Sequence, residues 1–394
     1  MTNISDITLQ KYRILSEESN QDKVLLMELS YWEKSEIRDE TQLVVVGAGI
    51  VGLSTALALK RMNHNNVVII LEKGALPTGA STKNAGFACF GSVTEILSDL
   101  KYNPWDEVVK IVRKRYNGLE KLKSLIPLDV MDYNSFGGYE VFLDNRGIPS
   151  IQQIELINQL VYEAIGIDQV YSLKDYTFGG GFANKCIYNY LEGQLNPAKM
   201  IKELSRQAMI SGVQIYYNAN VKSIEEKHVV VDQWGSIPYR KLALCTNGFA
   251  RDLLPDIEVT PARNQVMVTK PIPNLQLKGT FHLDEGYVYF RNIGNRLLLG
   301  GGRNQDFREE ETSKFGITDK ITHYLKSILF DFIIPNQTVE IDSWWSGIMG
   351  VGKSKNPIIQ KIGSKQYVGV KLGGMGVAIG VQTGEDLAQL ILEK

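Results

Sequence analysis

The chain has 394 residues, which is enough for two or three domains of ordinary size and for a large buried core. Hydrophobic residues make up 44% and charged residues 22% of it, and this composition excludes a mostly disordered or fibrous protein. The 43 basic residues nearly balance the 44 acidic ones. We therefore expect no nucleic-acid partner, because such proteins need a strongly positive surface, and we expect a small-molecule ligand instead.

The number and spacing of the cysteines and histidines indicate which compartment and which kinds of site to expect. Cys89, Cys186 and Cys245 are too few and too scattered for a disulfide framework. The first residues lack the apolar core of a signal peptide, and no later stretch reaches the ~18 apolar residues that cross a bilayer. No Cys or His pair has the spacing of metal ligands. These features predict a cytoplasmic protein with no transmembrane segment and no metal site.

The first predicted elements form a β-α-β unit after an N-terminal arm, residues 1–40. Residues 42–46 are an apolar, β-branched run, typical of a parallel strand buried on both faces. Apolar residues then recur with helical spacing over 50–62, and a second apolar run covers 67–71. Such a unit predicts an α/β layer with a right-handed crossover.

The turn between the first strand and the helix has the pattern G-x-G-x-x-G. Gly47 permits the tight bend, Gly49 lets the backbone approach a pyrophosphate, and Gly52 allows the helix to pack on the strand. The amides of Ile50 and Val51 would point at the phosphates, helped by the helix dipole. The pattern predicts a dinucleotide site, and the alternative is a glycine-rich turn that serves packing alone.

An acidic residue and a long loop follow the second strand. The carboxylate of Glu72 would accept hydrogen bonds from the ribose hydroxyls of the nucleotide. The segment 77–87 is too small and polar for a core and too long for a tight turn, and its many amides would suit a loop along a diphosphate and a flavin ring. From this region we expect cofactor contacts by Lys73, Gly79, Ala80, Ser81, Lys83, Asn84, Ala85, Gly86 and Phe87.

The strand, the glycine turn, Glu72 and then G-A-S-x-x-N-A-G at 79–86 resemble the FAD-dependent D-amino-acid oxidase superfamily. Glycine and sarcosine oxidases, D-amino-acid dehydrogenases and γ-glutamylputrescine oxidase belong to it. The likeness runs from about Tyr31 to the end of the chain. It implies non-covalent FAD and an α/β fold, with a Rossmann-like FAD-binding domain of the D-amino-acid oxidase and glutathione-reductase type. An α+β substrate domain of mainly antiparallel sheet would be inserted into it.

Later segments extend the resemblance. Residues 246–248 resemble the family's segment near the flavin, and 261–265 resemble its P-x-R-x-Q entry to the substrate domain. Residues 345–347 resemble the W-x-G piece, and 373–378 resemble the turn that opens the C-terminal helix at the flavin pyrimidine edge. Amides there would stabilise the negative charge of reduced flavin, unless the turn serves packing only. The resemblance implies flavin contacts by Val221, Thr246, Asn247, Gly248, Gly347, Gly373, Gly374, Met375, Gly376 and Val377.

The same resemblance suggests a division into two discontinuous domains. We expect the FAD-binding domain to comprise 41–98, 185–260 and 335–394. The substrate domain would comprise 99–184 and 261–334.

The chain departs from the family at the expected substrate site. Members that act on small α-amino acids often have an arginine in W-x-G-L-R-P that grips the carboxylate, and Met349 stands at that position here. The tyrosine-rich segment before Arg291 and the G-G-G-R sequence at 300–303 look more like the amine-oxidase branch. We expect an amine or amino-acid substrate, with a distal carboxylate as one option. The pocket candidates are Gln265, Tyr289, Arg291 and Arg303, each of which could instead make only structural contacts.

The reaction implied is oxidation of a C–N bond to an imine by hydride transfer to flavin N5, with oxygen or a quinone as the final acceptor. Two alternatives remain open. A flavin monooxygenase would use NAD(P)H and usually carries a Gly-Asp dipeptide before its last helix, which this sequence lacks. A non-catalytic scaffold would keep FAD for stability alone.

Overall fold

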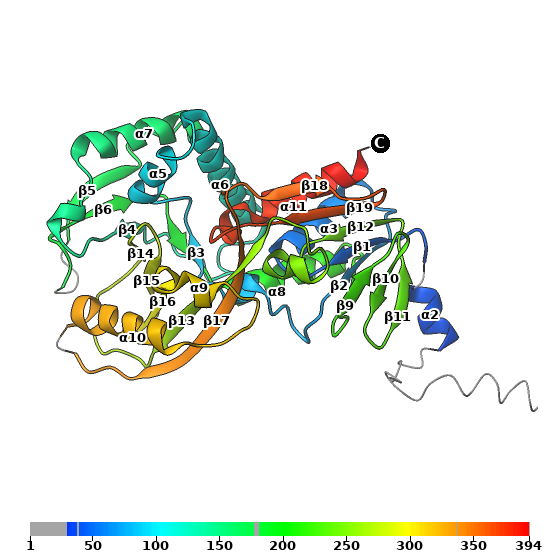
Figure 1. The fold of residues 1–394 in the computed structure, drawn as a ribbon. Coiled ribbons are helices and arrows are strands. Elements are labelled where there is room, and N and C mark those ends of the chain that lie inside the picture. The colour runs from blue at the N-terminus through cyan, green and yellow to red at the C-terminus, as the bar shows by residue number, and fades with distance from the viewer. Residues whose placement is uncertain (1–29, 38, 177–180, 336, 394) are drawn as a thin grey trace, which may run out of the picture.

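The computed structural model describes residues 30–37, 39–176, 181–335 and 337–393. Most of the predicted N-terminal arm lies outside the described residues, and its described end forms helix α2 (Tyr31–Ile37). Figure 1 shows two sheet-containing lobes side by side, with strands β1, β2 and β12 in one and β4 to β6 and β14 to β16 in the other. The expected α/β FAD-binding domain and the mainly antiparallel substrate domain can therefore be compared with the two lobes, one sheet at a time.

The first lobe is built on a sheet of six strands among the described residues, in the order β18-β19-β12-β1-β2-β8. Strands β19, β12, β1, β2 and β8 run parallel, and β18 is antiparallel at the edge. Every residue of β1 and β2 is buried, as the two apolar runs predict. The bounds are β1 Leu43–Val46, β2 Val68–Leu71, β8 Gln214–Tyr216, β12 Lys241–Leu244, β18 Ile358–Lys361 and β19 Gln366–Val370.

Two helices from opposite ends of the chain pack against each other beside this sheet. Helix α3 (Ile50–Met62) follows the glycine turn, and α11 (Gly376–Leu392) is the last helix. Gly384 makes the close approach possible, because a Cβ there would lie 2.8 Å from the carbonyl oxygen of Val51 and 2.6 Å from Cβ of Ser54. The packing brings the starts of both helices, and so both glycine-rich motifs, to one place.

The second lobe contains a mainly antiparallel sheet, with eight strands in the described part of the chain, in the order β17-β13-β16-β15-β14-β4-β6-β5. Its one parallel pair there is β14 with β4. Strands β13 and β17 form the longest ladder and extend toward the first lobe (Figure 1). The bounds are β4 Gly138–Glu140, β5 Tyr171–Asp175, β6 Lys185–Asn189, β13 Thr260–Thr269, β14 Thr280–Leu283, β15 Val288–Ile293, β16 Arg296–Gly301 and β17 Ile341–Val351.

The remaining elements cover or connect the two sheets. Helix α6 packs on α11 so closely that a Cβ on Gly118 would lie 2.0 Å from the carbonyl oxygen of Ala378. The bounds are α4 Ala80–Lys83, α5 Val93–Leu100, α6 Trp105–Leu125, α7 Ile151–Ile165, α8 Pro197–Ile210, α9 Phe307–Glu310, α10 Asp319–Ser327, η1 Asn145–Gly147, η2 Asn247–Asp252, η3 Arg303–Gln305 and η4 Ile328–Ile333, with strands β3 Phe87–Ala88, β7 Gly193–Gln194, β9 Val221–Ile224, β10 His228–Val231 and β11 Gly235–Pro238. No helix among the described residues is long and apolar enough to span a bilayer.

The division into domains stays a prediction, and the strands do not all fall on the expected side of it. Strands β6 and β17 belong to the eight-stranded sheet, although we expected 185–260 and 335–394 in the FAD-binding domain. Long-range strand pairing decides this membership, and no local pattern in the sequence records it.

Candidate functional site

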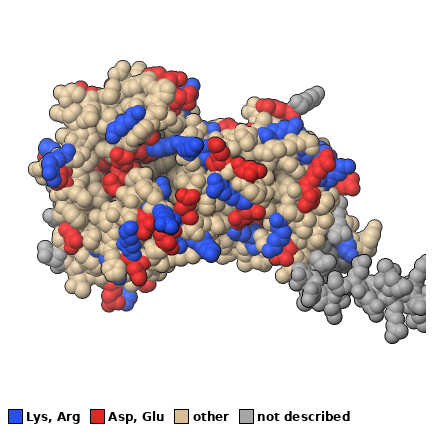
Figure 2. Space-filling model, viewed as in Figure 1, with Lys and Arg blue, Asp and Glu red and all other residues tan. Residues whose placement is uncertain are grey.

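A cavity of about 840 Å³ lies between the two lobes, within the usual size range of cofactor and ligand pockets. One wall consists of the glycine turn, the 77–87 loop and the turn before α11. The other wall consists of side chains from β13, β14, β15 and β17. We call these the backbone wall and the sheet wall. Acidic and basic side chains are interspersed over the face seen in Figure 2, in keeping with the near-zero net charge.

The glycine turn adopts the bend that the motif predicts. Gly47 has φ +102°, a conformation that L side chains rarely adopt. A Cβ on Gly52 would lie 1.9 Å from the carbonyl oxygen of Gly47, so Gly52 serves packing and does not itself line the cavity. The Glu72 carboxylate accepts from the amide of Ala48 at 2.9 Å and from that of Gly74 at 3.1 Å. The predicted ribose-binding acid thus also braces the turn.

The 77–87 loop is held onto the start of α3. Ser81 Oγ accepts from the Ile50 amide at 3.0 Å. Asn84 donates to the carbonyl oxygens of Ala80 and Ser81, and its Oδ1 accepts from the Gly86 amide at 2.8 Å. These side-chain bonds fold the loop back along the cavity, with its free amides available to a ligand.

Arg291 holds the C-terminal end of the 77–87 loop in place and does not line the cavity. Its guanidinium donates to the carbonyl oxygens of Ala85 and, at 3.0 Å, Leu195. Burial lowers the pKa of Arg291 to about 10. A Cβ on Gly86 would lie 2.1 Å from the Leu195 oxygen, so Gly86 also serves packing. The structure therefore places Arg291, a predicted pocket residue, behind the cavity wall, with its donors used on backbone carbonyl oxygens.

The turn before α11 opens directly onto the cavity. Asn247 Oδ1 accepts from the amides of Lys371 and Leu372 at 3.0 and 3.3 Å. Gly373 has φ +58°, and a Cβ there would meet nothing within 4 Å. Met375 at the N-cap provides no side-chain hydrogen bond, so the first amides of α11 remain available for a ligand.

Gly248, a predicted flavin contact, lies away from this opening. A Cβ on Gly248 would lie 2.5 Å from the Met349 carbonyl oxygen and 2.9 Å from the Ile348 side chain. The residue therefore lets η2 pack closely on β17 and does not itself line the cavity.

The sheet wall combines polar side chains, among them Asn264 and Tyr289, with apolar ones such as Met349. Asn264 Nδ2 donates to the Tyr289 hydroxyl at 3.2 Å and lies 4.0 Å from Met349 Sδ. Phe87 meets Tyr289 and His282 edge-on, with ring centroids 5.5 and 5.3 Å apart. Burial raises the pKa of Tyr289, so its phenol stays protonated. Asn264 Oδ1 is buried without a hydrogen-bond partner in the described structure.

His282 is a further titratable residue of the sheet wall, beside Tyr289. Its Nε2 lies 2.8 Å from Glu192 Oε2. Burial opposes the charged imidazole, but the carboxylates of Glu192, Glu140 and Glu95 outweigh it and raise the pKa of His282. Neither His282, Asn264 nor Met349 as a wall residue was predicted. The signal that could have found them is the two-residue period of the strands, which places them on one face once the register is known.

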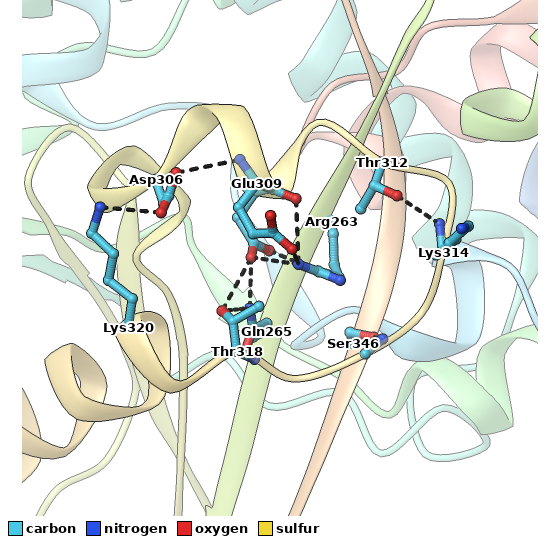
Figure 3. A network of polar contacts seen from close by, with 11 residues as sticks. Arg263, Gln265, Asp306, Glu309, Thr312, Lys314, Thr318, Lys320 and Ser346 are labelled. Carbon is cyan, nitrogen blue, oxygen red and sulfur yellow. Dashed lines mark hydrogen bonds and ion pairs between the residues drawn. The ribbon is translucent and has the colours of Figure 1, made fainter.

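Gln265 belongs to a buried network outside the cavity (Figure 3). Its Nε2 donates to Glu310 Oε1 at 2.8 Å and to Thr318 Oγ1 at 2.7 Å. Arg263 grips the same carboxylate in a fork, at 3.0 and 2.9 Å. This network fixes α9 and the segment around Thr318 onto β13. Gln265, a predicted pocket residue, thus does not line the cavity, because its side chain points to the opposite face of the strand from Asn264.

Arg303 does line the cavity. Its guanidinium carbon lies 5.4 Å from the ring centroid of Tyr287 and 5.0 Å from that of Phe307. Burial lowers the pKa of Arg303, and the cation–π contacts with the two rings offset part of the cost of burying its charge.

A cluster of ion pairs spans another part of the cavity rim. Lys355 Nζ lies 2.8 Å from Glu95 Oε1 and 2.7 Å from Asp99 Oδ1. Arg115 Nη1 lies 3.1 Å from the same Glu95 oxygen. Burial would raise the pKa of Glu95, but Arg115 and Lys355 outweigh it and hold that pKa at about 2. In the described part of the chain no three His, Cys, Asp or Glu side chains are placed to hold a metal ion.

Comparison with known proteins identifies the family. The family described as FAD dependent oxidoreductase matches residues 42–390. This chain belongs to that family. The predicted membership of the D-amino-acid oxidase superfamily and the predicted cofactor, FAD, are thereby confirmed.

Among curated relatives of this FAD-dependent oxidoreductase is "Probable oxidoreductase OrdL" of Haemophilus influenzae. It is 22% identical over 90% of this chain and 83% of its own length. The bifunctional protein ThiO/ThiG of Synechocystis is 25% identical over 77% of this chain, and the match spans only 44% of that protein.

Solved structures share the fold at low sequence identity. L-proline dehydrogenase from P. horikoshii has a TM-score of 0.71 at 17% identity, covering 90% of this chain and 94% of that one. Glycine oxidase from Bacillus cereus has 0.68 at 18%, covering 89% and 94%. L-α-glycerophosphate oxidase from Mycoplasma pneumoniae with FAD bound has 0.70 at 17%, covering 90% and 95%. The predicted fold class is confirmed.

The backbone wall of this family member fits FAD. It offers a glycine turn at a helix start, free amides at a second helix start, and Thr246 Oγ1, a buried polar atom with no partner in the described structure. Predicted cofactor residues that line the cavity are Gly47, Gly49, Ile50, Val51, Glu72, Lys73, Gly79, Ala80, Ser81, Lys83, Asn84, Ala85, Phe87, Val221, Thr246, Asn247, Gly347, Gly373, Gly374, Met375, Gly376 and Val377. Their individual contacts with FAD stay predictions.

Proposed function

We propose that this chain oxidises the C–N bond of an amine or amino acid to an imine, which water then hydrolyses to a carbonyl compound and the free amine. FAD supplies the chemistry of the oxidation when bound, because its N5 accepts the hydride that leaves the substrate carbon. The substrate nitrogen gives up a proton, and the two electrons pass on to oxygen or a quinone.

One observation carries the proposal: Asn264 Oδ1 is a buried hydrogen-bond acceptor in the sheet wall with no donor among the described residues. A buried acceptor without a donor costs free energy, so its position favours a ligand that brings an N–H group. The neighbouring Tyr289 hydroxyl, kept protonated by burial, can donate a hydrogen bond in return. Together they can orient an amine over the opposite wall and keep water away from it.

The comparisons support an amino compound as the substrate. L-proline dehydrogenase and glycine oxidase, which have this fold, act on amino acids by name. Met349 stands where many α-amino-acid oxidases have an arginine, and its thioether cannot pair with a carboxylate. The substrate nitrogen is thus supported better than an α-carboxylate held in that mode.

The test is reduction of the flavin in the FAD-loaded protein under nitrogen. The panel comprises primary amines, N-methyl amines, γ-glutamyl amines and D-amino acids, with glycerol 3-phosphate and NADPH as separate arms. We expect at least one amine to bleach the flavin without nicotinamide. Bleaching by NADPH alone would indicate a monooxygenase, bleaching by glycerol 3-phosphate alone a C–O oxidase, and no bleaching a scaffold. Each of these three results would overturn the proposal.

A further inference from the structure

The buried arginines of the described chain use their N–H donors in contacts with other residues of the protein. Arg115 pairs with Glu95 and donates to the Phe90 carbonyl oxygen at 3.2 Å. Arg263 forks onto Glu310, and Arg291 donates to backbone carbonyl oxygens. Each is buried, with 3% to 6% of its surface exposed, so each would be costly if left without partners.

Arg303 differs from these three arginines. It is half-buried and lines the cavity, yet its guanidinium makes no hydrogen bond or ion pair with any residue in the described ranges. Burial lowers the pKa of Arg303, and the partner that opposes this is Tyr287, not a carboxylate. Glu285 also lines the cavity, but no ion pair within 4.0 Å joins it to Arg303. A cation partly removed from water and without a counter-charge marks a place for an anion.

The aromatic clamp holds the guanidinium ready for such an anion. The Tyr287 and Phe307 rings meet edge-on, 77° apart, and both lie within cation–π distance of the guanidinium. The N–H donors of Arg303 have no hydrogen-bond partner in the described ranges and can therefore fork onto a carboxylate. Phe307 opens α9, and the buried Glu310 at the other end of α9 is fixed to Arg263 and Gln265 (Figure 3). The clamp is therefore braced before any ligand arrives, which lowers the entropic cost of binding.

The clamp also lies at a distance from the proposed amine position. Tyr287 lies in the turn that precedes β15, two residues before Tyr289, and two residues of chain span at most about 7 Å. A group bound at Arg303 would therefore sit at the other end of a ligand whose nitrogen reaches Asn264 and Tyr289.

We propose that Arg303 binds a carboxylate at the end of the substrate remote from the oxidised C–N bond. The substrate class is then an amine with a distal acid, an ω-amino acid or an N-substituted relative of one. The identity of the amine end rests on the proposed function, whereas the anion site itself does not.

The experiment measures binding first, without catalysis. FAD-loaded wild type, Arg303→Met, Arg303→Lys and the control Arg308→Met are titrated with glutarate and with its neutral diamide, followed by the flavin spectrum and by calorimetry. Arg308 is exposed, lies on the same segment and does not line the cavity, so its variant removes an equal charge from solvent-facing surface. Unfolding temperatures confirm that each variant is folded.

We expect Arg303→Met to weaken glutarate binding at least about tenfold, as loss of a charge-assisted hydrogen bond predicts. Arg303→Lys should fall between, because it keeps the charge without the fork, and Arg308→Met should match wild type. The diamide should bind weakly to all four proteins. Equal glutarate affinity in wild type and Arg303→Met, or equal losses in Arg303→Met and Arg308→Met, would overturn the inference.

A kinetic arm separates this inference from the proposed function. Flavin reduction is compared for δ-aminovalerate and n-pentylamine, and we expect Arg303→Met to lower kcat/KM for the first by about tenfold and to spare the second. If amines reduce the flavin but glutarate binding ignores Arg303, the function stands and the anion site fails. If glutarate needs Arg303 but no amine reduces the flavin, the anion site stands and the function fails.

Discussion

The two walls of the cavity differ in the chemical groups that they present to a ligand. The backbone wall presents amides and glycine Cα atoms, positioned by segments that are each continuous in sequence. The sheet wall presents side chains from β13, β14, β15 and β17, which only the strand register brings together. We therefore expect the backbone wall to tolerate few changes in the size of its residues. We expect the sheet wall to tolerate changes in the size of its side chains but few changes in their polar groups.

The largest effect is expected from Gly52→Val on the backbone wall. The new Cβ would overlap the carbonyl oxygen of Gly47, 1.9 Å away, and we expect a loss of about 3 kcal/mol or more in the free energy of unfolding, together with loss of bound FAD. Denaturant unfolding and the FAD content of the purified protein measure both. The matched control is Gly147→Val, because Gly147 is exposed, does not line the cavity, and a Cβ there would meet only the Phe142 side chain, at an ordinary contact distance of 3.6 Å. Full FAD content and unchanged stability in Gly52→Val would contradict the expected sensitivity of the backbone wall to added atoms.

Arg291→Met should have the next largest effect. It leaves the carbonyl oxygens of Ala85 and Leu195 without their donor, and we expect a loss of about 2–3 kcal/mol in unfolding free energy and weaker FAD binding. Arg303→Met should change unfolding free energy by less than about 0.5 kcal/mol, because the guanidinium has no hydrogen bond or ion pair to lose among the described residues and a methionine can keep the contact with the two rings. Thermal unfolding and FAD titration of both variants decide this. A larger loss of stability and of FAD binding in Arg303→Met than in Arg291→Met would show that Arg303 is the structural arginine and that Arg291 is the one available to a ligand.

A smaller effect tests the ion pairs that join α5 to the segment after β17. The pKa of Glu95 is held at about 2, below its ordinary 4.5, although burial alone would raise it. A depressed pKa contributes stability that is present above pH 4.5 and is lost as the pH falls from there toward 2.

Lys355→Met should flatten that acid-side loss and lower stability at neutral pH by roughly 1 kcal/mol, since Lys355 is partly exposed. Urea unfolding of wild type and variant across this pH range is the measurement. A slope that is unchanged in the variant would mean that Lys355 does not set the Glu95 pKa.

A small effect on stability, with a larger one on catalysis, is expected from Tyr289→Phe on the sheet wall. The change removes the hydroxyl that accepts from Asn264 at 3.2 Å, so unfolding free energy should fall by about 1 kcal/mol or less. FAD content should stay at the wild-type level, while flavin reduction by the best amine becomes slower. Anaerobic rapid mixing gives the rate. Loss of FAD with an unchanged reduction rate would contradict the division of labour between the walls.

The same contrast explains what could be predicted from the sequence. The elements predicted at 42–46, 50–62 and 67–71 are observed as β1, α3 and β2, because strand, glycine turn and helix are each encoded locally. The turn at 373–378 that the resemblance places at the opening of the last helix coincides with the start of α11 at Gly376.

The four predicted pocket residues show why the rest could not be predicted. Tyr289 and Arg303 line the cavity as expected, but Gln265 is used by Glu310 and Arg291 by Ala85. These partners lie far away in sequence and depend on how β13 and β15 meet α9 and the 77–87 loop. The same long-range pairing hides Asn264 and His282, whose neighbours in sequence carry no motif.

The most direct test is a crystal structure of the FAD-loaded protein with glutarate bound. The account predicts the flavin ring between the 373–377 turn and the sheet wall that carries Asn264 and Tyr289, with a glutarate carboxylate on Arg303 in the same cavity. A flavin ring placed outside this cavity, or a ring that leaves no space between itself and the sheet wall, would contradict it.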